Sequence, residues 1–164
     1  MTQVYARKPM DDRDAITALL YRYAEAMDRG DFATVADLFR HARIRVGPGA
    51  EDFLDAPAML ELWENTVIRY ADGTPCTKHV TTNVIVEVEP DGRQAASRSY
   101  YTVFQQVDAG PLHPIISGRY HDRFEQVEGE WRFAERDYTL VDLVGDLSQH
   151  LRIDVAPSPP STRG

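Results

Sequence analysis

The chain has 164 residues, of which 43% are hydrophobic and 27% are charged, and a formal net charge of −8. This length suits one domain with one hydrophobic core. The acidic balance argues against nucleic acid as a partner, because such a chain repels phosphate backbones. No apolar run reaches the roughly 20 residues that span a bilayer, and the N-terminus lacks the apolar segment of a secretory signal. We therefore expect a cytoplasmic protein with no membrane partner.

Three regions are expected along the chain: an N-terminal arm at 1–10, one folded domain at 11–150 and a flexible tail at 151–164. The tail is predicted because the last nine residues, APSPPSTRG, hold three prolines and almost no apolar mass. No internal repeat or linker divides the middle of the chain. The single cysteine, Cys76, has no second cysteine with which to form an intramolecular disulfide.

Helical spacing of apolar residues predicts three helices in the first half, at about 12–29, 32–39 and 57–70. The first begins after Asp11 or Asp12 as N-cap and is stopped by Gly30, and the second begins after Asp31. Pro57 suits the first turn of the third. A strand at 42–47 and a loop at 48–55 are expected between the second and third helices.

The second half predicts four strands, at 78–88, 94–107, 115–127 and 130–140, because β-branched and aromatic residues alternate there between glycine-containing turns. Helices gathered early and strands late indicate an α+β domain. The helices should pack on one face of a curved, mainly antiparallel sheet. Such an arrangement would enclose a pocket between the helices and the sheet.

Asp28 is the first candidate for acid–base chemistry. It falls near the apolar stripe of the first helix and in its last turn. Burial and the helix dipole would together raise the pKa of its carboxyl group unless a cation lies nearby, which would make a usable general base. The alternative is a solvated carboxylate at the end of a helix.

His79 is the second candidate, at the start of the first long strand. Strict alternation places it on one face with Thr81, Asn83 and Ile85, and places Val84 and the other valines on the opposite face. On that face a histidine lines a polar pocket or lies at the surface.

Arg136 is the third candidate. It lies in the last predicted strand, in step with Ala134 and Tyr138 and out of step with Trp131 and Phe133. An arginine in the middle of a strand reaches solvent or meets an anion.

Cofactor chemistry finds no support in the motifs of the chain. No pair of histidines has ligand spacing with a carboxylate, so we expect no metal site. Neither a nucleotide-binding loop nor a nucleophilic serine motif occurs. We therefore expect a protein without a cofactor.

Three segments resemble the SnoaL-like branch of the NTF2-like superfamily: DAITALLYRYAEAMDRGDFATVADLF, TKHVTTNVIVEV and GRYHDRFEQVEGEWRFAERDY. The resemblance covers about residues 10 to 142 and implies a cone-shaped α+β fold. It is strongest to scytalone dehydratase and hexachlorocyclohexane dehydrochlorinase, which are cofactor-free lyases with an Asp–His pair. It places the family aspartate at Asp28, the family histidine at His79 and the dehydrochlorinase's arginine at Arg136.

The resemblance implies a cofactor-free lyase or isomerase that acts on a small, mostly apolar, cyclic molecule. His79 would take a proton from carbon, Asp28 would orient its ring, and Arg136 would stabilise negative charge on a leaving group or enolate. The substrate-binding positions would be Tyr23, Tyr120, Val46 and Tyr138. The dehydrochlorinase's lysine falls on Tyr23, and the dehydratase's tyrosine falls near Val46, so neither enzyme's substrate is transferred to this chain.

The same fold serves other functions, and the sequence leaves them open. One alternative is a non-catalytic subunit or binding module like the β subunit of ring-hydroxylating dioxygenases, whose interior should be filled by side chains. Another is a polyketide cyclase or an epoxide-opening enzyme. Apolar residues occupy both faces of the strands, such as Val84 against Ile85 and Val103 against Phe104. Because helices cover only one face, we expect a homo-oligomer, a trimer or a dimer.

Overall fold

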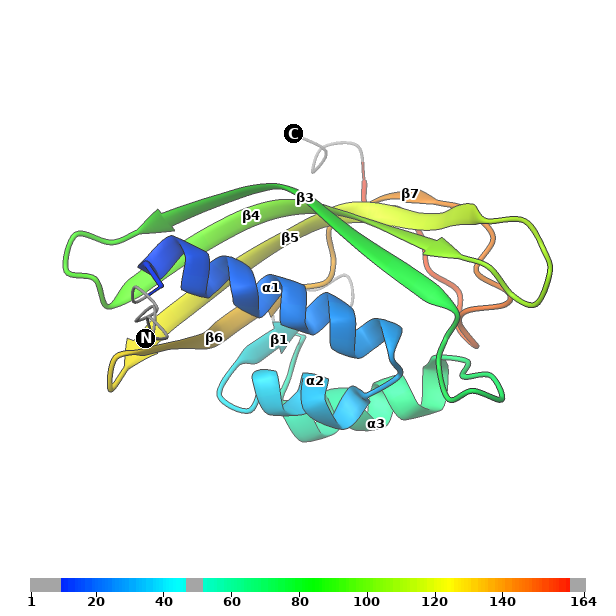
Figure 1. Ribbon diagram of the computed structural model, residues 1–164, viewed down its shortest axis with the longest axis horizontal. Helices are drawn as coiled ribbons and strands as arrows, with labels where there is room; N and C mark the ends of the chain where they lie inside the picture. Colours follow the sequence, from blue (N-terminus) through cyan, green and yellow to red (C-terminus); the bar gives the residue numbers. More distant parts are fainter. Residues whose placement is uncertain (1–9, 47–51, 160–164) are drawn as a thin grey trace, which may run out of the picture.

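The computed structural model describes residues 10–46 and 52–159. Within these residues three helices cover one face of a curled sheet of seven strands (Figure 1), so the predicted α+β class is confirmed. Most of the predicted arm, the loop at 48–51 and the end of the tail lie outside the described residues. The helices are α1 (Asp12–Asp28), α2 (Phe32–Leu38) and α3 (Ala56–Thr66). The strands are β1 (Arg43–Arg45), β2 (Phe53–Leu54), β3 (Thr77–Val88), β4 (Gln94–Gln105), β5 (His113–Val127), β6 (Glu130–Asp137) and β7 (Val141–Val144).

Each helix begins at an aspartate cap. Asp11, Asp31 and Asp55 each accept a hydrogen bond from the backbone N–H three residues further on, which satisfies a donor at the helix start. Helix α3 ends at Thr66, earlier than the predicted Tyr70. The hydroxyl of Thr66 donates back to the carbonyl of Leu62, and the next residue, Val67, is extended and bridges with Leu151.

The sheet has the strand order β2-β1-β6-β5-β4-β3, and β7 pairs with β5. Strands β3 to β6 form the predicted antiparallel meander. Strand β1 lies parallel to β6, which joins the first half of the chain to the second. The predicted fourth strand ends at Asp137, not at residue 140, and β7 is a further strand that the sequence analysis missed.

A β-bulge in β3 overturns the predicted alternation around His79. The pairing with β4 shifts between Thr82 and Ile85, and Asn83 has φ 52°, in the left-handed region. The extra residue turns Val84 and Val86 to the same face as His79 and sends Ile85 to the opposite face, where it is exposed. The prediction that His79 faces away from the valine row is therefore wrong.

A second β-bulge, in β6, makes the predicted face of Arg136 wrong. The pairing of β5 with β6 shifts between Arg123 and Phe124, which leaves Ala134 as the extra residue of β6. Arg136 consequently shares the buried face with Trp131 and Phe133, with which the sequence had placed it out of step.

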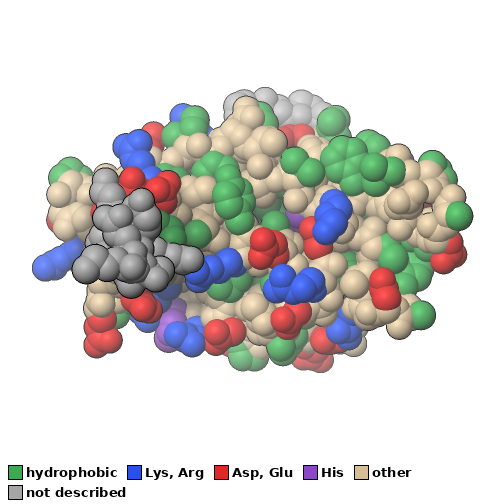
Figure 2. Space-filling model, in the orientation of Figure 1, with side chains coloured by type: hydrophobic (Ala, Val, Ile, Leu, Met, Phe, Trp, Pro, Cys, Tyr) green, Lys and Arg blue, Asp and Glu red, His purple; other side chains and the backbone are tan. Residues whose placement is uncertain are grey.

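The core lies between α1 and the sheet. Ile16, Leu20 and Tyr23 of α1 are almost fully buried, and each such apolar side chain contributes about 1.5–3 kcal/mol by leaving water. Figure 1 shows α1 lying across one face of the sheet, with α2 and α3 beyond it. Acidic and basic side chains are interspersed over the face that Figure 2 shows, so no large patch of one sign forms there. None of the described helices is long and apolar enough to cross a membrane.

The face of the sheet away from the helices exposes apolar side chains. Val80, Ile85 and Tyr100 are each more than two-fifths exposed there. Self-association through this face stays a prediction, which sedimentation velocity at micromolar concentration would check.

The predicted tail makes contacts as far as it is described. The hydroxyl of Ser158 donates to the carbonyl of Thr139 at 2.6 Å and accepts from the N–H of Val141 at 2.9 Å. Ser158 is buried. These contacts hold the described part of the segment against the strand β7.

The bulge at Asn83 gives a test of the fold. A β-branched residue in the left-handed region is strained, so Asn83→Val should lower the free energy of unfolding by about 1–2 kcal/mol. Asn83→Gly should leave it nearly unchanged, because glycine adopts this conformation freely. Urea unfolding measures both values. Thr82→Val, at the exposed neighbouring position with ordinary φ, is the matched control. Equal stability of the two valine variants would contradict the account of the bulge.

Candidate active site

Asp28 is placed by the way helix α1 ends. Gly30 has φ 68°, and its N–H donates to the carbonyl of Met27 while that of Asp31 donates to the carbonyl of Ala26. This is the Schellman arrangement, which stops a helix at a left-handed glycine. A Cβ on Gly30 would also lie 2.3 Å from the carbonyl oxygen of Gly73. The last residue of the helix, Asp28, is thereby held against the start of β3.

Three donors converge on the carboxylate of Asp28. The ring Nδ1 of His79 lies 2.6 Å from Oδ1, the backbone N–H of His79 donates to both oxygens, and the hydroxyl of Thr77 donates to Oδ1 at 2.9 Å. The side chains of Asp28 and His79 are only 9% and 7% exposed. The two predicted residues thus meet directly, within the distance expected for a hydrogen bond.

The pKa of Asp28 follows the exception for a nearby cation, because His79, which can carry a positive charge, lies beside the carboxyl group. Burial is the largest influence and by itself raises the pKa of the carboxyl group, but the hydrogen bonds and charge of His79 and the hydroxyl of Thr77 outweigh it. The net pKa is lowered, so the group is a carboxylate at neutral pH. A carboxylate can only accept hydrogen bonds, so Nδ1 of His79 must carry the proton. In the neutral form of the ring, the second nitrogen, Nε2, is then the basic one.

Tyr23 links this pair to the centre of the domain. Its ring meets the ring of His79 edge-on, with 6.2 Å between the centroids, and its hydroxyl lies 3.5 Å from that of Tyr120. The guanidinium carbon of Arg136 lies 4.2 Å from the centroid of the Tyr23 ring and 4.1 Å from the centroid of the Tyr120 ring. Arg136 is therefore in contact with the aromatic neighbour of His79.

The carboxylate that Arg136 meets is Asp122, which the sequence analysis did not single out. Nε and Nη2 of the guanidinium donate to the two carboxylate oxygens at 2.7 and 2.8 Å. Both side chains are fully buried. Burial opposes the charge on the guanidinium, but the adjacent Asp122 outweighs it and holds the pKa of Arg136 above its ordinary value. The pair is neutral as a whole, and Nη1 has no hydrogen-bond partner among the described residues.

Aromatic rings occupy the space between α1 and the sheet around Arg136. Tyr120 stacks on Tyr101 with 4.3 Å between the centroids, and Tyr138 packs against both Tyr23 and Tyr120. Burial raises the pKa of the phenols of Tyr101, Tyr120 and Tyr138 above the ordinary value, so these groups stay protonated and can donate hydrogen bonds.

The other two predicted substrate-binding residues lie near the end of β1. The N–H of Tyr138 donates to the carbonyl of Arg45, next to the partly buried Val46. The hydroxyl of Tyr138 is buried and interacts with the side chains of Tyr23 and Arg136.

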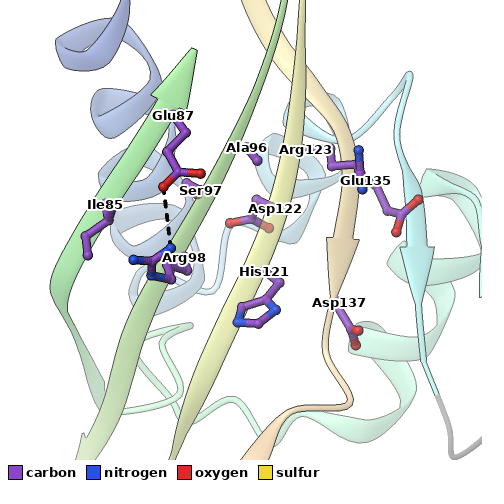
Figure 3. Close-up of a pocket in the computed structure, with 10 residues that line it drawn as sticks. All are labelled: Ile85, Glu87, Ala96, Ser97, Arg98, His121, Asp122, Arg123, Glu135 and Asp137. Carbon is purple, nitrogen blue, oxygen red and sulfur yellow. Dashed lines mark ion pairs between the residues drawn. The ribbon is translucent and has the colours of Figure 1, made fainter. Parts of the chain in front are cut away.

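An enclosed pocket at the Asp28–His79 pair stays a prediction. The hollow drawn in Figure 3 lies on the other face of the sheet, where Arg98 and Glu87 form an ion pair and His121 faces outward, and neither Asp28 nor His79 lines it. The described residues also hold no cluster of three or more histidine, cysteine, aspartate or glutamate side chains that could bind a metal ion.

A second buried histidine lies near the pair. His150 is 7% exposed, and the charges of His79 and Asp28 both act on its ring. Its Nδ1 is buried and lacks a hydrogen-bond partner within the described part of the chain. Burial above all, and the charge of His79, lower the pKa of His150 to about 4, so the ring is neutral at neutral pH.

The comparisons with known proteins settle the family. A model of the SnoaL-like domain matches residues 8–137. The chain belongs to this family. The resemblance inferred from the three sequence segments is thereby confirmed. A search among curated proteins finds no match for this SnoaL-like domain.

Solved structures with the same fold include three from Novosphingobium aromaticivorans. A candidate scytalone dehydratase is 20% identical with a TM-score of 0.65, covering 89% of this chain and 90% of its own. The β subunit of a candidate aromatic-ring-hydroxylating dioxygenase is 20% identical with a TM-score of 0.62, covering 81% and 90%. An NTF2-like protein with a cystatin-like fold is 22% identical with a TM-score of 0.62, covering 77% and 79%. At these identities the likeness establishes the fold of the SnoaL-like domain.

Two functional candidates escaped the sequence analysis, Asp122 and His150. Asp122 lies opposite Arg136 in the pairing of β5 with β6, so its role depends on the bulge at Ala134, for which the sequence gives no clear signal. His150 lies in the segment after β7, far from the motifs of the SnoaL-like family. The only sign in the sequence that His150 is buried is its place between the apolar residues Leu147 and Leu151.

The low pKa of His150 predicts a pH dependence of stability. The folded protein holds this ring neutral down to about pH 4, whereas the unfolded chain takes up a proton near pH 6.5. The stability is therefore full above pH 6.5 and is lost as the pH falls toward 4, by about 3 kcal/mol in the free energy of unfolding. Asp28 contributes a loss of the same sign only below its ordinary value of 3.8.

Urea unfolding between pH 7 and pH 4 measures this loss. His150→Asn, which has no titrating group, should show a flatter profile over the same range. Parallel profiles for the wild-type protein and the variant would show that His150 does not cause the dependence.

Proposed function

We propose that this SnoaL-like domain is a cofactor-free lyase or isomerase that removes a proton from carbon in a small, mostly apolar, cyclic molecule. The contact between Nδ1 of His79 and the carboxylate of Asp28 supports this proposal above all other observations. It fixes the tautomer, leaves Nε2 as the base, and places a negative charge where the imidazolium will form. The donors from Thr77 and from the backbone of His79 hold the carboxylate in place during this change.

In a dehydration, His79 can both take up the proton and give it back. Nε2 takes a proton from the carbon next to a carbonyl, and the electrons of the C–H bond form the new double bond as the C–O bond breaks. The departing hydroxide takes the proton back from the imidazolium and leaves as water. In an isomerisation the same proton returns to a different carbon.

The interior suits a neutral ligand better than an anion. Arg136 is already neutralised by Asp122, so it offers a ligand hydrogen-bond donors, such as Nη1, and no net charge. The protonated phenols add further donors, and the rings of Tyr23, Tyr120 and Tyr138 offer apolar surface. The role proposed for Arg136 is therefore to hold an oxygen that gains partial negative charge, together with these phenols.

One observation favours a second candidate function, a non-catalytic subunit or binding module. The aromatic rings packed between α1 and the sheet fill space that a substrate would need. A β subunit of a dioxygenase is among the structures with this fold. In such a subunit the Asp28–His79 contact would serve only to join α1 to β3.

Turnover by single-site variants tests the catalytic proposal. The wild-type protein should convert at least one member of a panel of cyclic β-hydroxy ketones, enolisable cyclic ketones and cyclic halides. His79→Ala removes the base and should lower kcat/KM by about 100-fold or more. Asp28→Asn should also lower it, because the amide no longer fixes the tautomer. The double variant should be little worse than His79→Ala, since the two residues act as a unit.

Two variants provide matched controls. His121→Ala removes an exposed histidine on the other face of the sheet, and Asp31→Asn changes an aspartate that caps α2. Both should keep wild-type turnover. If His79→Ala converts the substrate as fast as the wild-type protein does, the catalytic assignment is wrong and the subunit function gains support.

A further inference from the structure

A short turn after β7 holds His150 beside the segment that connects α3 with β3. The N–H of His150 donates to the carbonyl of Leu147, and its own carbonyl accepts from the N–H of Ile68, each at 2.9 Å. The next residue, Leu151, bridges with Val67. Hydrogen bonds within the turn fix the backbone at His150. Further backbone contacts fix it against the segment that connects α3 with β3.

Gln105 clamps this turn against the start of β3. Its buried side-chain amide donates to the carbonyls of Pro75 and Gln149, each at 3.0 Å. Gln105 lies opposite Thr77 in the pairing of β3 with β4, and Thr77 donates to Asp28. His150 thus follows a residue that is held beside the Asp28–His79 pair.

The ring of His150 is neutral and has an unused nitrogen. It is 7% exposed, and Nδ1 makes no hydrogen bond with any residue that the structure describes. The charged groups that act on the ring are His79 from β3, which opposes its protonation, and Asp28 from α1, which favours it. The phenol of Tyr70, on the connection before β3, binds the carbonyl of Gln149 and so holds the backbone next to His150.

A buried polar atom without a partner destabilises a fold, so its presence calls for an explanation. Nδ1 of His150 has the chemistry of a ligand-binding group, because a neutral imidazole can donate one hydrogen bond from a protonated nitrogen. The charges of Asp28 and His79, the two residues to which we assign the reaction, both act on the ring of His150. The ring that carries the unused nitrogen is therefore electrostatically coupled to the proposed base.

We propose that His150 is the third functional residue of this site and that its Nδ1–H binds the carbonyl oxygen of the substrate. This inference rests on the proposed function of Asp28 and His79. When His79 removes a proton from the neighbouring carbon, negative charge develops on that oxygen, and a neutral imidazole stabilises it without giving up a proton. Protonated His79 opposes a second positive charge nearby, so His150 stays neutral throughout the step.

The inference narrows the class of substrate. A donor placed for a carbonyl oxygen favours cyclic ketones and cyclic β-hydroxy ketones over cyclic halides, which have no such oxygen. Among the members of the panel, the oxygenated compounds should therefore be the ones that the protein converts.

Dehydration of 3-hydroxycyclohexanone by two variants tests the role of His150. His150→Leu lacks a donor and should lower kcat/KM at least tenfold, mainly through kcat. His150→Asn places an amide N–H near the position of Nδ1 and should recover most of the loss. His121→Leu, on the exposed face, should not change turnover. Urea unfolding of each variant shows whether it is folded under the assay conditions.

Binding of cyclohexanone gives a readout that needs no turnover. The ring ¹⁵N signals of His150 should shift when cyclohexanone is added, both in the wild-type protein and in the inactive His79→Ala variant. No shift up to the solubility limit of cyclohexanone overturns the inference.

The outcomes separate this inference from the proposed function. If His79→Ala keeps its turnover, the proposed function fails. If His79→Ala loses turnover while His150→Leu keeps it, His150 has no part in the reaction and the inference fails alone. Equal losses in His150→Leu and His150→Asn also overturn it, because a bound oxygen requires the donor that asparagine retains.

Discussion

The hydrogen bonds to the carboxylate of Asp28 are the interactions on which the arrangement of the site depends. They join the last residue of α1 to the first residues of β3, where the helix meets the start of the meander. The left-handed Gly30 ends the helix at that point, and its close approach to Gly73 leaves no room for a side chain. Because the same carboxylate fixes the ring of His79, the contact that closes the fold also sets the chemistry of the imidazole.

A second buried ion pair limits what the interior can bind. Arg136 and Asp122 are fully buried and neutralise each other, and aromatic rings surround the guanidinium. Such a pair is costly to desolvate, and breaking it by removing one partner is more costly still. Arg136 is therefore a structural residue as well as a candidate donor. The aromatic rings packed around Arg136 fill space that a substrate would need, which favours the alternative of a non-catalytic subunit.

The fold and the Asp28–His79 contact were predictable because they rest on local rules: aspartate caps, a glycine stop, alternation in the strands, and a family pattern in three segments. The faces of β3 and β6 were not predictable. One extra residue in each strand, at Asn83 and at Ala134, moves every side chain after it to the opposite face of the sheet. Neither residue gives a clear signal of a bulge. Asp122 and His150 were missed because pairing across the sheet and a clamp by Gln105 bring them into place.

The protonation of the His79 ring tests the central claim most directly. In protein labelled with ¹⁵N-histidine, long-range proton–nitrogen spectra of the neutral imidazole distinguish a protonated ring nitrogen from a basic one. The account predicts a proton on Nδ1 and a free, basic Nε2 in the wild-type protein, and a loss of this preference in Asp28→Asn. A proton on Nε2 in the wild-type protein, or the same spectrum in both proteins, would contradict the assignment of His79 as a base oriented by Asp28.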